Sequence, residues 1–396
     1  MNVSVSLPPH ILDLMARIES AGEEVYVVGG SLRDALLGIP PHDFDLAVSS
    51  TPDRTARILE DFRVIETGIA HGTVTVIASG EPVEITTFRV DGDYTDARHP
   101  DGVTFTRRIE EDLSRRDFTV NAMAYHPRKG LCDPFGGRED LERGILRAVR
   151  EPRLRFSEDA LRIMRAFRFS AQLGFQIEEE TLRGILETKE GLSRIAVERI
   201  ASELLRLLCS PSPEAPLRLM AEYGILPFVT GDYCPSDRIL SLMEKSRPVE
   251  EERLGLFFAE AGEEKATEVL KWLRLSNKQI TACRAVLRAS RTAIHGESDA
   301  RRLIADCGVY APFGVRVSVL LGSSPAEAIG WVEDNRSPCT LSELAVGGRE
   351  LIAAGIEPRR IGRTLEWLLR LVLEDPAKNE KELLLSCALA YHKDRS

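Results

Sequence analysis

The segment from residue 25 to residue 48 constrains the fold more than any other part of this chain. It opens with the apolar run Val25 to Val28, which predicts a buried strand. Gly29-Gly30 then predicts a tight turn, and Ser31 to Leu37 predicts a short helix. Backbone N–H groups at the start of such a helix attract phosphate, and Arg33 adds a positive charge beside them. We therefore expect a phosphate-binding turn where the buried strand ends.

Two carboxylates follow this turn. Asp43 and Asp45 flank Phe44, and the run from Phe44 to Val48 predicts a second strand. Because side chains alternate along a strand, both carboxylates would then face one side and Phe44 the other. Such a pair presents the hard oxygen ligands that Mg2+ prefers. An isolated Asp-x-Asp is usually a solvated turn, but its place after a strand, a Gly-Gly turn and a helix favours a metal site.

The composition predicts a globular protein. Of the 396 residues, 43% are apolar, which is enough for two to four domains with hydrophobic cores. There is no long uncharged apolar run and no signal-peptide pattern, so we expect a cytoplasmic protein without a membrane partner. The seven cysteines show no paired spacing, and we expect reduced thiols.

Charge is distributed unevenly along the chain. The formal net charge of −10 argues against unselective binding to DNA, other nucleic acids or anionic membranes. Residues 138–168, however, carry nine arginines against six acidic residues. This local excess predicts a basic patch that contacts one folded polyanion.

The periodicity of apolar residues changes near residue 140. Before it, Val74 to Ile77 and Val83 to Phe88 add two predicted strands, so residues 1–140 predict an α+β domain with a small mixed sheet. After Leu141 the strand patterns nearly vanish. Helical periodicity predicts helices at residues 158–173, 196–208, 214–223 and 239–245.

The sequence alone does not decide the roles of several further polar side chains in the first domain. Glu84 offers a third carboxylate, unless it faces solvent. His71 is interpreted as a turn residue rather than as a ligand or base. Residues 91–102 predict a mobile loop, because they are polar and interrupted by Gly and Pro. Asp117 and Asn121 are spaced i, i+4 on a predicted helix, and they brace either a ribose or each other.

The segment from Ser157 to Phe169 predicts a helix with Ser157 as its N-cap. Asp159 and Arg162 share a face of this helix at i, i+3, where an ion pair is normally a solvated surface contact. Arg165 is next along this face. Arg168 is rotated roughly half a turn from Asp159, and we expect it to form a structural pair.

A fixed Asp and Arg also match the edge of a nucleobase. A carboxylate accepts the exocyclic amine of cytosine or adenine, while a guanidinium donates to the ring acceptor beside it. Uracil and guanine carry a carbonyl where the amine would be. Asp159 and Arg162 could therefore admit C and A and reject U and G.

In this order, the motifs resemble those of the class II tRNA nucleotidyltransferases, the family of CCA-adding enzymes and bacterial poly(A) polymerases. The agreement extends from residue 22 to about residue 206. The matching motifs are Gly29 to Asp34 with Asp43-Phe44-Asp45, Arg115 to Ala122, Glu158 to Arg162, and Glu198-Arg199-Ile200.

The resemblance implies a seahorse-shaped molecule with an α+β nucleotidyltransferase head and an all-α remainder. The head would comprise residues 1–140, a base-recognising neck residues 141–207, a helical body residues 208–312 and a tRNA-binding helical tail residues 313–396. It also implies Mg2+ on Asp43 and Asp45, with Glu84 as the candidate third catalytic carboxylate, and base selection by Asp159 and Arg162. The residues expected to hold the triphosphate and the sugar are Gly29, Gly30, Arg33, Arg116, Asp117, Asn121 and Arg165.

Within the family, residues 67–75 resemble the CCA-adding branch, because poly(A) polymerases carry a Gly-Arg-Arg-Phe-like stretch there. The loop at 91–102 looks complete, whereas CC-adding enzymes have a shortened one, and we expect it to help switch the pocket from CTP to ATP. Residues 344–363 resemble the tail that grips the tRNA elbow.

The implied reaction is template-independent addition of CCA to the tRNA 3′ end from CTP and ATP, with release of pyrophosphate. Two alternatives stay open. One is an A-adding enzyme that acts on tRNA ending in CC, and the other is a catalytically silent RNA-binding protein on the same fold.

Overall fold

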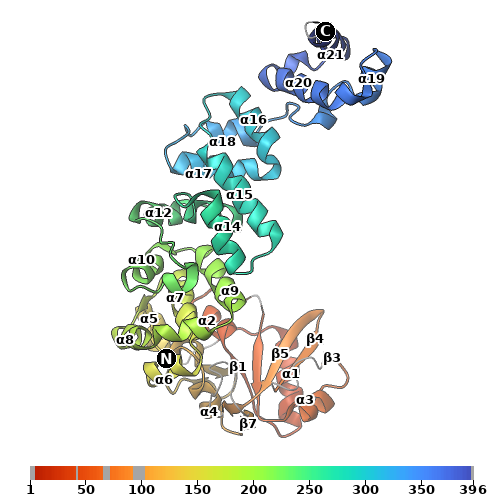
Figure 1. The fold of residues 1–396 in the computed structure, drawn as a ribbon. Helices are drawn as coiled ribbons and strands as arrows, with labels where there is room; N and C mark the ends of the chain where they lie inside the picture. Colours follow the sequence, from red (N-terminus) through yellow and green to blue (C-terminus); the bar gives the residue numbers. More distant parts are fainter. Residues whose placement is uncertain (1–4, 42, 66–71, 92–102, 394–396) are drawn as a thin grey trace. The chain divides into compact units, whose positions relative to one another are not determined.

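The computed structural model describes residues 5–41, 43–65, 72–91 and 103–393. His71 and most of the predicted loop, residues 92–102, therefore lie outside the described residues. The chain divides into two compact units (Figure 1). The first unit comprises Met1–Leu207 and Leu219–Val229, and the second comprises Leu208–Arg218 and Thr230–Ser396. The finer division into head, neck, body and tail stays a prediction.

The first unit is built around a mixed sheet. Within the described residues this sheet has seven strands, in the spatial order β3 (Arg63–Ile65), β4 (Thr73–Ala78), β5 (Glu81–Thr87), β2 (Asp45–Val48), β1 (Val25–Val28), β8 (Ala124–His126) and β9 (Gly130–Cys132). β2 runs parallel to β5 and antiparallel to β1, so the sheet is mixed as predicted. β6 (Arg89–Asp91) and β7 (Val103–Phe105) form a separate antiparallel pair.

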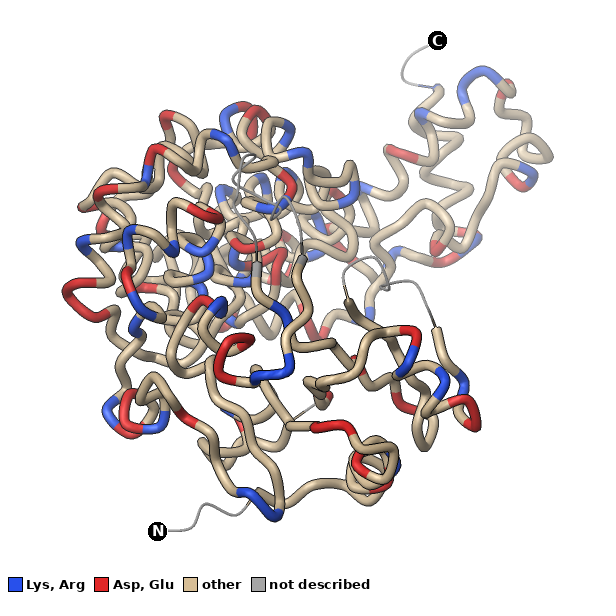
Figure 2. The backbone as a smooth tube through the Cα atoms, turned by 90° about the horizontal axis from the view of Figure 1, so that it is seen from below, with Lys and Arg blue, Asp and Glu red and all other residues tan. Residues whose placement is uncertain are grey.

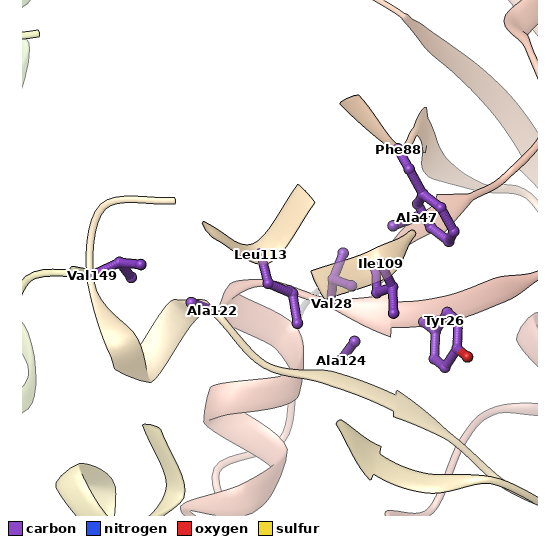
Figure 3. Packing of buried hydrophobic residues seen from close by; sticks show 9 residues of the cluster. All are labelled: Tyr26, Val28, Ala47, Phe88, Ile109, Leu113, Ala122, Ala124 and Val149. Atoms are coloured by element: carbon purple, nitrogen blue, oxygen red, sulfur yellow. The ribbon is translucent and has the colours of Figure 1, made fainter. Parts of the chain in front are cut away.

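Both faces of the central strands are buried. Tyr26 and Val28 of β1 and Ala47 of β2 belong to a cluster on one face that also holds Ile109 and Leu113 (Figure 3). The alternate side chains of β1, Val25 and Val27, are also buried. A strand buried on both faces reads as a continuous apolar run, which is why Val25 to Val28 was recognisable from sequence.

Helices cover this sheet and continue beyond it. Up to residue 230 they are α1 (Pro9–Ser20), α2 (Gly30–Leu36), α3 (Pro52–Ile58), α4 (Ile109–Ser114), α5 (Gly137–Arg143), α6 (Pro152–Glu158), α7 (Leu161–Leu173), α8 (Glu179–Thr188), α9 (Val197–Leu208), α10 (Glu214–Glu222) and α11 (Pro227–Thr230). A short parallel pair, β10 (Ile145–Leu146) with β11 (Gln176–Ile177), adds strands where none was predicted.

Two predicted helices are wrong in detail. The helix expected at residues 158–173 is interrupted at Asp159, which has extended backbone angles (φ −142°, ψ 102°) between α6 and α7. Ser157 lies inside α6 and is no N-cap. The helix expected from Arg115 to Ala122 is a single 3-10 turn at Thr119–Asn121.

The strand that carries the paired aspartates is shorter than predicted. β2 begins at Asp45, so Asp43 precedes the strand instead of alternating within it.

The second unit is all-helical in the residues that the structure describes. Its helices are α12 (Asp237–Leu242), α13 (Glu250–Phe257), α14 (Gly262–Trp272), α15 (Asn277–Arg291), α16 (Glu297–Cys307), α17 (Ala311–Leu320), α18 (Ala328–Glu333), α19 (Gly348–Ala353), α20 (Ile361–Glu374) and α21 (Lys381–Lys393). The predicted succession of a mixed-sheet domain and helices is thereby confirmed.

One helical stretch in the described part of the chain, Glu297–Leu320, is long and apolar enough to cross a membrane by length and composition alone. Gly308 (φ 55°) divides this stretch into α16, a 3-10 turn and α17. α17 packs against α15, with Val315 and Val317 fully buried. The stretch is weak evidence for a membrane span.

A substitution at Gly137 tests how α5 packs against the Thr119–Asn121 turn. A Cβ atom on Gly137 would lie 2.2 Å from the carbonyl oxygen of Thr119, in the turn that ends at Asn121. Gly137→Ala should therefore destabilise the protein by about 1–3 kcal/mol, because backbone must shift to admit the methyl group. Gly362→Ala is the matched control, since Gly362 also lies in the first turn of a helix and its Cβ would meet no atom within 4 Å. Equal denaturant midpoints for the two variants would contradict this packing.

Candidate active site

A polar pocket of about 680 Å³ lies within the first unit. It collects side chains from α2, β2, the Thr119–Asn121 turn, α7 and α9. Its lining contains all of the predicted site residues except Glu84. Those residues are Gly29, Gly30, Arg33, Asp43, Asp45, Arg116, Asp117, Asn121, Asp159, Arg162 and Arg165.

Gly29 is required where β1 turns into α2. Its backbone angles (φ 80°, ψ −147°) are ones that residues with a side chain rarely adopt. A Cβ atom there would lie 3.3 Å from Oδ2 of Asp45 and 3.4 Å from a guanidinium nitrogen of Arg116. The glycine therefore lets backbone, carboxylate and guanidinium meet at one corner of the pocket.

Arg33 of α2 is held by two polar partners. Its side chain is 4% exposed, and it donates to Oδ1 of Asp34 from Nε at 2.8 Å. A second nitrogen donates to Oδ1 of Asn121 at 2.8 Å. Two fixed hydrogen bonds restrict the guanidinium to one orientation at the pocket wall.

Asp43, Asp45 and Glu84 bring like charges together. Glu84 of β5 is exposed and pairs in register with Asp45 across the two parallel strands. Burial, followed by repulsion from Asp43 and Glu84, raises the pKa of Asp45 to about 6, although Arg116 opposes the shift. A divalent cation would relieve this repulsion, so the residues fit a metal.

The described residues contain no group of three or more His, Cys, Asp or Glu side chains that could hold a metal ion. Mg2+ is typically bound by one or two carboxylates together with substrate phosphates rather than by an all-protein cage. Asp43 and Asp45 beside the Gly29 turn match that arrangement. Whether Glu84 contacts a metal stays a prediction, because its side chain does not line the pocket.

Asp117 is the most deeply embedded carboxylate of the pocket. It accepts hydrogen bonds from the Phe118 N–H (2.8 Å) and the Asn121 side-chain amide (3.2 Å), and it pairs with Arg165 at 2.6 Å. Burial alone would raise the pKa of Asp117, but Arg165 and these donors lower it to about 2. Asp117 and Asn121 contact each other, which is one of the two alternatives that the sequence left open, and a 3-10 turn and not an α-helix creates the contact.

Asp159 and Arg162 both line the pocket, but not as a pair on one helix face. The Asp159 carboxylate accepts from the Leu161 N–H at 3.0 Å and from Arg199 at 2.9 Å. Arg162 donates to Glu158 at 2.6 Å and to the carbonyl of Arg115 at 3.2 Å. The break at Asp159 thus gives each side chain its own support.

Residues 138–168 do not form a free basic patch, which corrects the interpretation from sequence. Figure 2 shows basic and acidic positions interspersed along the chain. Eight of the nine arginines pair with acids of the described chain. The pairs are Arg138–Glu142, Arg143–Glu139, Arg147–Asp140, Arg153–Glu187, Arg155–Glu158, Arg162–Glu158, Arg165–Asp117 and Arg168–Glu203. The structural pairing expected of Arg168 is confirmed.

Sequence reasoning assigned no role to Arg199 and Glu158, which hold Asp159 and Arg162. Both residues stood inside matching motifs, so their presence was visible but their partners were not. Helical spacing on α9 was the available signal, since Arg199 and Glu203 lie one turn apart and both contact residues around α7.

Comparisons with known proteins identify the family of the chain. The family described as Poly A polymerase head domain matches residues 25–147, and the family described as probable RNA and SrmB-binding site of polymerase A matches residues 174–230. A CCA-adding enzyme of Geobacillus stearothermophilus is 34% identical over 398 residues, which cover 97% of each chain. One of Pediococcus pentosaceus is 37% identical over 395 residues, covering 96% of this chain and 97% of the relative.

Solved structures similar to this chain also include CCA-adding enzymes. The Bacillus stearothermophilus CCA-adding enzyme in complex with CTP has a TM-score of 0.82 and 32% identity, covering 98% of this chain and 99% of that one. The Thermotoga maritima CCA-adding enzyme complexed with tRNA-CCA has a TM-score of 0.70 and 25% identity, covering 97% and 96%.

The fold and the site define a nucleotidyltransferase. More narrowly, the chain belongs to the family of CCA-adding tRNA nucleotidyltransferases. This membership indicates that the enzyme depends on a divalent metal.

Asp45 and Asp117 should affect stability in opposite directions. Because the folded state raises the pKa of Asp45 to about 6, ionisation of Asp45 opposes folding above about pH 4 when no cation is bound. Asp45→Asn should therefore raise the melting temperature at pH 7.5 in a chelator, and this gain should shrink as the pH is lowered toward 4.

Asp117→Asn supplies the contrast. The pKa of Asp117 is lowered to about 2, so its charge stabilises the fold at neutral pH, and this contribution is lost only as the pH falls through that value. Removing the charge leaves Arg165 partly buried without its partner and should lower the melting temperature at pH 7.5. Shifts of the same sign in both variants would refute this electrostatic assignment.

Proposed function

We infer that this chain adds the 3′-terminal CCA to tRNA from CTP and ATP, without a nucleic-acid template and with release of pyrophosphate. The observation that carries this conclusion is that one pocket collects the residues proposed to bind phosphate, metal and base, from motifs spread over residues 29–199. Full-length relatives at 34–37% identity are CCA-adding enzymes, which favours complete CCA addition over addition of the terminal A alone.

We propose that the metal is Mg2+ and that Asp43 and Asp45 hold it, with Glu84 beside them. When bound, the ion would stabilise the charge that develops on the phosphates as the tRNA 3′-OH attacks the α-phosphate. Burial and the neighbouring carboxylates raise the pKa of Asp45, and Arg116 limits this rise and so favours the ionised form, the form that binds a cation.

The triphosphate fits the corner formed by Gly29, Gly30, Arg33 and Arg116. The glycines leave room for phosphate oxygens to approach the backbone, and the two guanidinium groups supply charge-assisted hydrogen bonds. Arg33 keeps its orientation because Asp34 and Asn121 already hold it.

The sugar fits beside Asp117, Asn121 and Arg165. Asp117 stays ionised at neutral pH, because its pKa is about 2. An ionised carboxylate accepts a hydrogen bond from a ribose hydroxyl, the Arg165 guanidinium can only donate, and the Asn121 amide has both a donor and an acceptor. We therefore assign these three residues to the ribose.

The base fits between Asp159 and Arg162. Arg199 and Glu158 restrain these side chains before a nucleotide binds, so the acceptor and donor pattern exists in advance. Such a pattern matches the amine-bearing edges of cytosine and adenine and leaves uracil and guanine with an unmatched carbonyl.

The remaining proposals concern the protein as a whole. We propose that it is cytoplasmic, that residues 1–140 and 141–207 act as head and neck, and that residues 208–312 and 313–396 form the body and tail. We propose that the tail contacts the tRNA elbow.

The metal assignment predicts that Asp43→Ala and Asp45→Ala abolish incorporation of both CTP and ATP. The assay uses tRNA lacking CCA, tRNA ending in C and tRNA ending in CC, with products resolved on gels. Asp53→Ala is a matched control, because Asp53 is an exposed aspartate in the first turn of α3. More than a few per cent of parental turnover in a folded Asp43 or Asp45 variant would refute the assignment. A parent enzyme that extends only tRNA ending in CC would show the A-adding alternative instead.

Base selection predicts a different outcome for Asp159→Ala and Arg162→Ala. These residues lie at the base and not at the reacting phosphate, so metal-dependent chemistry should persist while UTP and GTP become competitive substrates. Discrimination of about 1–3 kcal/mol per residue, or roughly 5- to 150-fold, should be lost. If both variants still reject UTP and GTP as the parent does, base selection lies elsewhere.

A further inference from the structure

Asp112 lies under the pocket without lining it. It belongs to α4, whose Ile109 and Leu113 pack into the core cluster beside the sheet (Figure 3). Its side chain is only 1% exposed. A buried carboxylate at this place is costly unless it is fully hydrogen-bonded, so its partners indicate its purpose.

Asp112 holds two consecutive arginines. Its Oδ1 accepts from Nε of Arg115 at 3.0 Å and from a second nitrogen of Arg115 at 2.8 Å, while Oδ2 accepts from Arg116 at 3.3 Å. Oδ1 also accepts from the Arg89 N–H at 3.3 Å. Burial alone would raise the pKa of Asp112, but Arg115 and Arg116 outweigh it and lower the pKa, so the group is an anion at neutral pH.

Arg116 connects Asp112 to the corner of the pocket where the triphosphate is proposed to bind. One of its nitrogens donates to the Asn121 carbonyl at 3.3 Å, and the same nitrogen lies at the corner formed by Gly29 and Asp45. Within the described residues, Nε of Arg116 is buried and has no hydrogen-bond partner. Besides the Asn121 carbonyl, Asp112 is therefore the group that fixes where the Arg116 charge points.

Arg115 connects Asp112 to Arg162, on the side of the pocket where the base is proposed to bind. Its backbone carbonyl accepts from Arg162 at 3.2 Å, and the preceding carbonyl, of Ser114, accepts from Arg155 at 3.3 Å. Clamping of the Arg115 side chain by Asp112 thus fixes the backbone that supports a base-reading arginine.

We propose that Asp112 is a positioning residue for nucleotide binding, which sets the phosphate-binding Arg116 and, through the Arg115 backbone, the base-reading Arg162. This inference rests on the proposed function. Asp112 acts through its two arginines and does not touch the nucleotide.

Substitution of a residue that only stabilises the fold would lower stability without changing nucleotide affinity. Glu252 supplies the matched control for that case. It is equally buried (1% exposed), and it accepts hydrogen bonds from the backbone N–H and the side chain of one arginine, Arg247, but it lies in the second unit. Asp112→Asn and Glu252→Gln should both lower the melting temperature.

The two variants should differ in steady-state kinetics on tRNA ending in CC or lacking CCA. Asp112→Asn should raise KM for both ATP and CTP about tenfold with kcat changed less than about threefold, because it removes orientation and not chemistry. Its preference for CTP over UTP should also fall. Glu252→Gln should keep the parental KM and preference. A parental KM in Asp112→Asn would overturn the inference.

A double-mutant cycle tests the route through Arg116. If part of the Asp112 effect passes through Arg116, Asp112→Asn should raise KM by a smaller factor in the Arg116→Ala background than in the parent, whereas independent effects would multiply. Multiplication would overturn this route. If Asp112→Asn does not fold, Arg116→Lys replaces it, because a lysine keeps the charge but lacks the two separate terminal nitrogens that donate to Asp112 and to the Asn121 carbonyl. A KM for Arg116→Lys near that of Arg116→Ala supports the inference, and a parental KM contradicts it.

The experiment separates this inference from the proposed function. A parent enzyme that incorporates neither CTP nor ATP would refute the proposed function itself. An active parent with an unchanged Asp112→Asn KM would refute only the role of Asp112.

Discussion

The buried charge of Asp117 is the constraint on which the nucleotide pocket depends. This carboxylate has to be satisfied from several elements at once, and Arg165 of α7, the amide of Asn121 and the N–H of Phe118 satisfy it. Asn121 in turn orients Arg33 of α2. One buried anion therefore helps to fix the position of α7 relative to the Gly29 turn, and removing it would leave the partly buried Arg165 without its carboxylate partner.

The same logic explains why the pocket contains both like and opposite charges. Burial of Asp45, followed by repulsion from Asp43 and Glu84, raises the pKa of Asp45 to about 6. Nearby, Asp112, Asp117 and Glu158 are each held by arginines. Carboxylates that are already paired fix the arginines, whereas Asp43, Asp45 and Glu84, which form no ion pair within the described residues, mark the place where a cation adds most stability. Repulsion between neighbouring carboxylates, with the raised pKa that it causes, is typical of functional sites.

Local signals in the sequence were sufficient for the Gly29 turn and for β1, β2, β4 and β5, whereas β3, β8 and β9 of the same sheet were not predicted. Val25 to Val28 is apolar because both faces of β1 are buried, and Gly29 is glycine because of its φ of 80° and its contacts with Asp45 and Arg116. Periodicity failed at Asp159, because apolar residues continue on both sides of a break that the carboxylate itself stabilises by accepting from the Leu161 N–H. The contact of Arg199 with Asp159 escaped prediction because it joins residues 40 positions apart through tertiary packing. The pairs Glu158–Arg162 and Asp112–Arg116 are spaced i, i+4, but in a segment with several neighbouring charges this spacing alone did not single them out.

The central claim is that phosphates, sugar and base occupy one preformed pocket of the first unit. A crystal structure of the complex with CTP and Mg2+ tests it most directly. The account predicts the triphosphate at Gly29, Arg33 and Arg116 with a metal on Asp43 and Asp45, and the cytosine edge within hydrogen-bond distance of Asp159 and Arg162. A nucleotide bound outside this pocket, or a base that contacts neither Asp159 nor Arg162, would contradict the account.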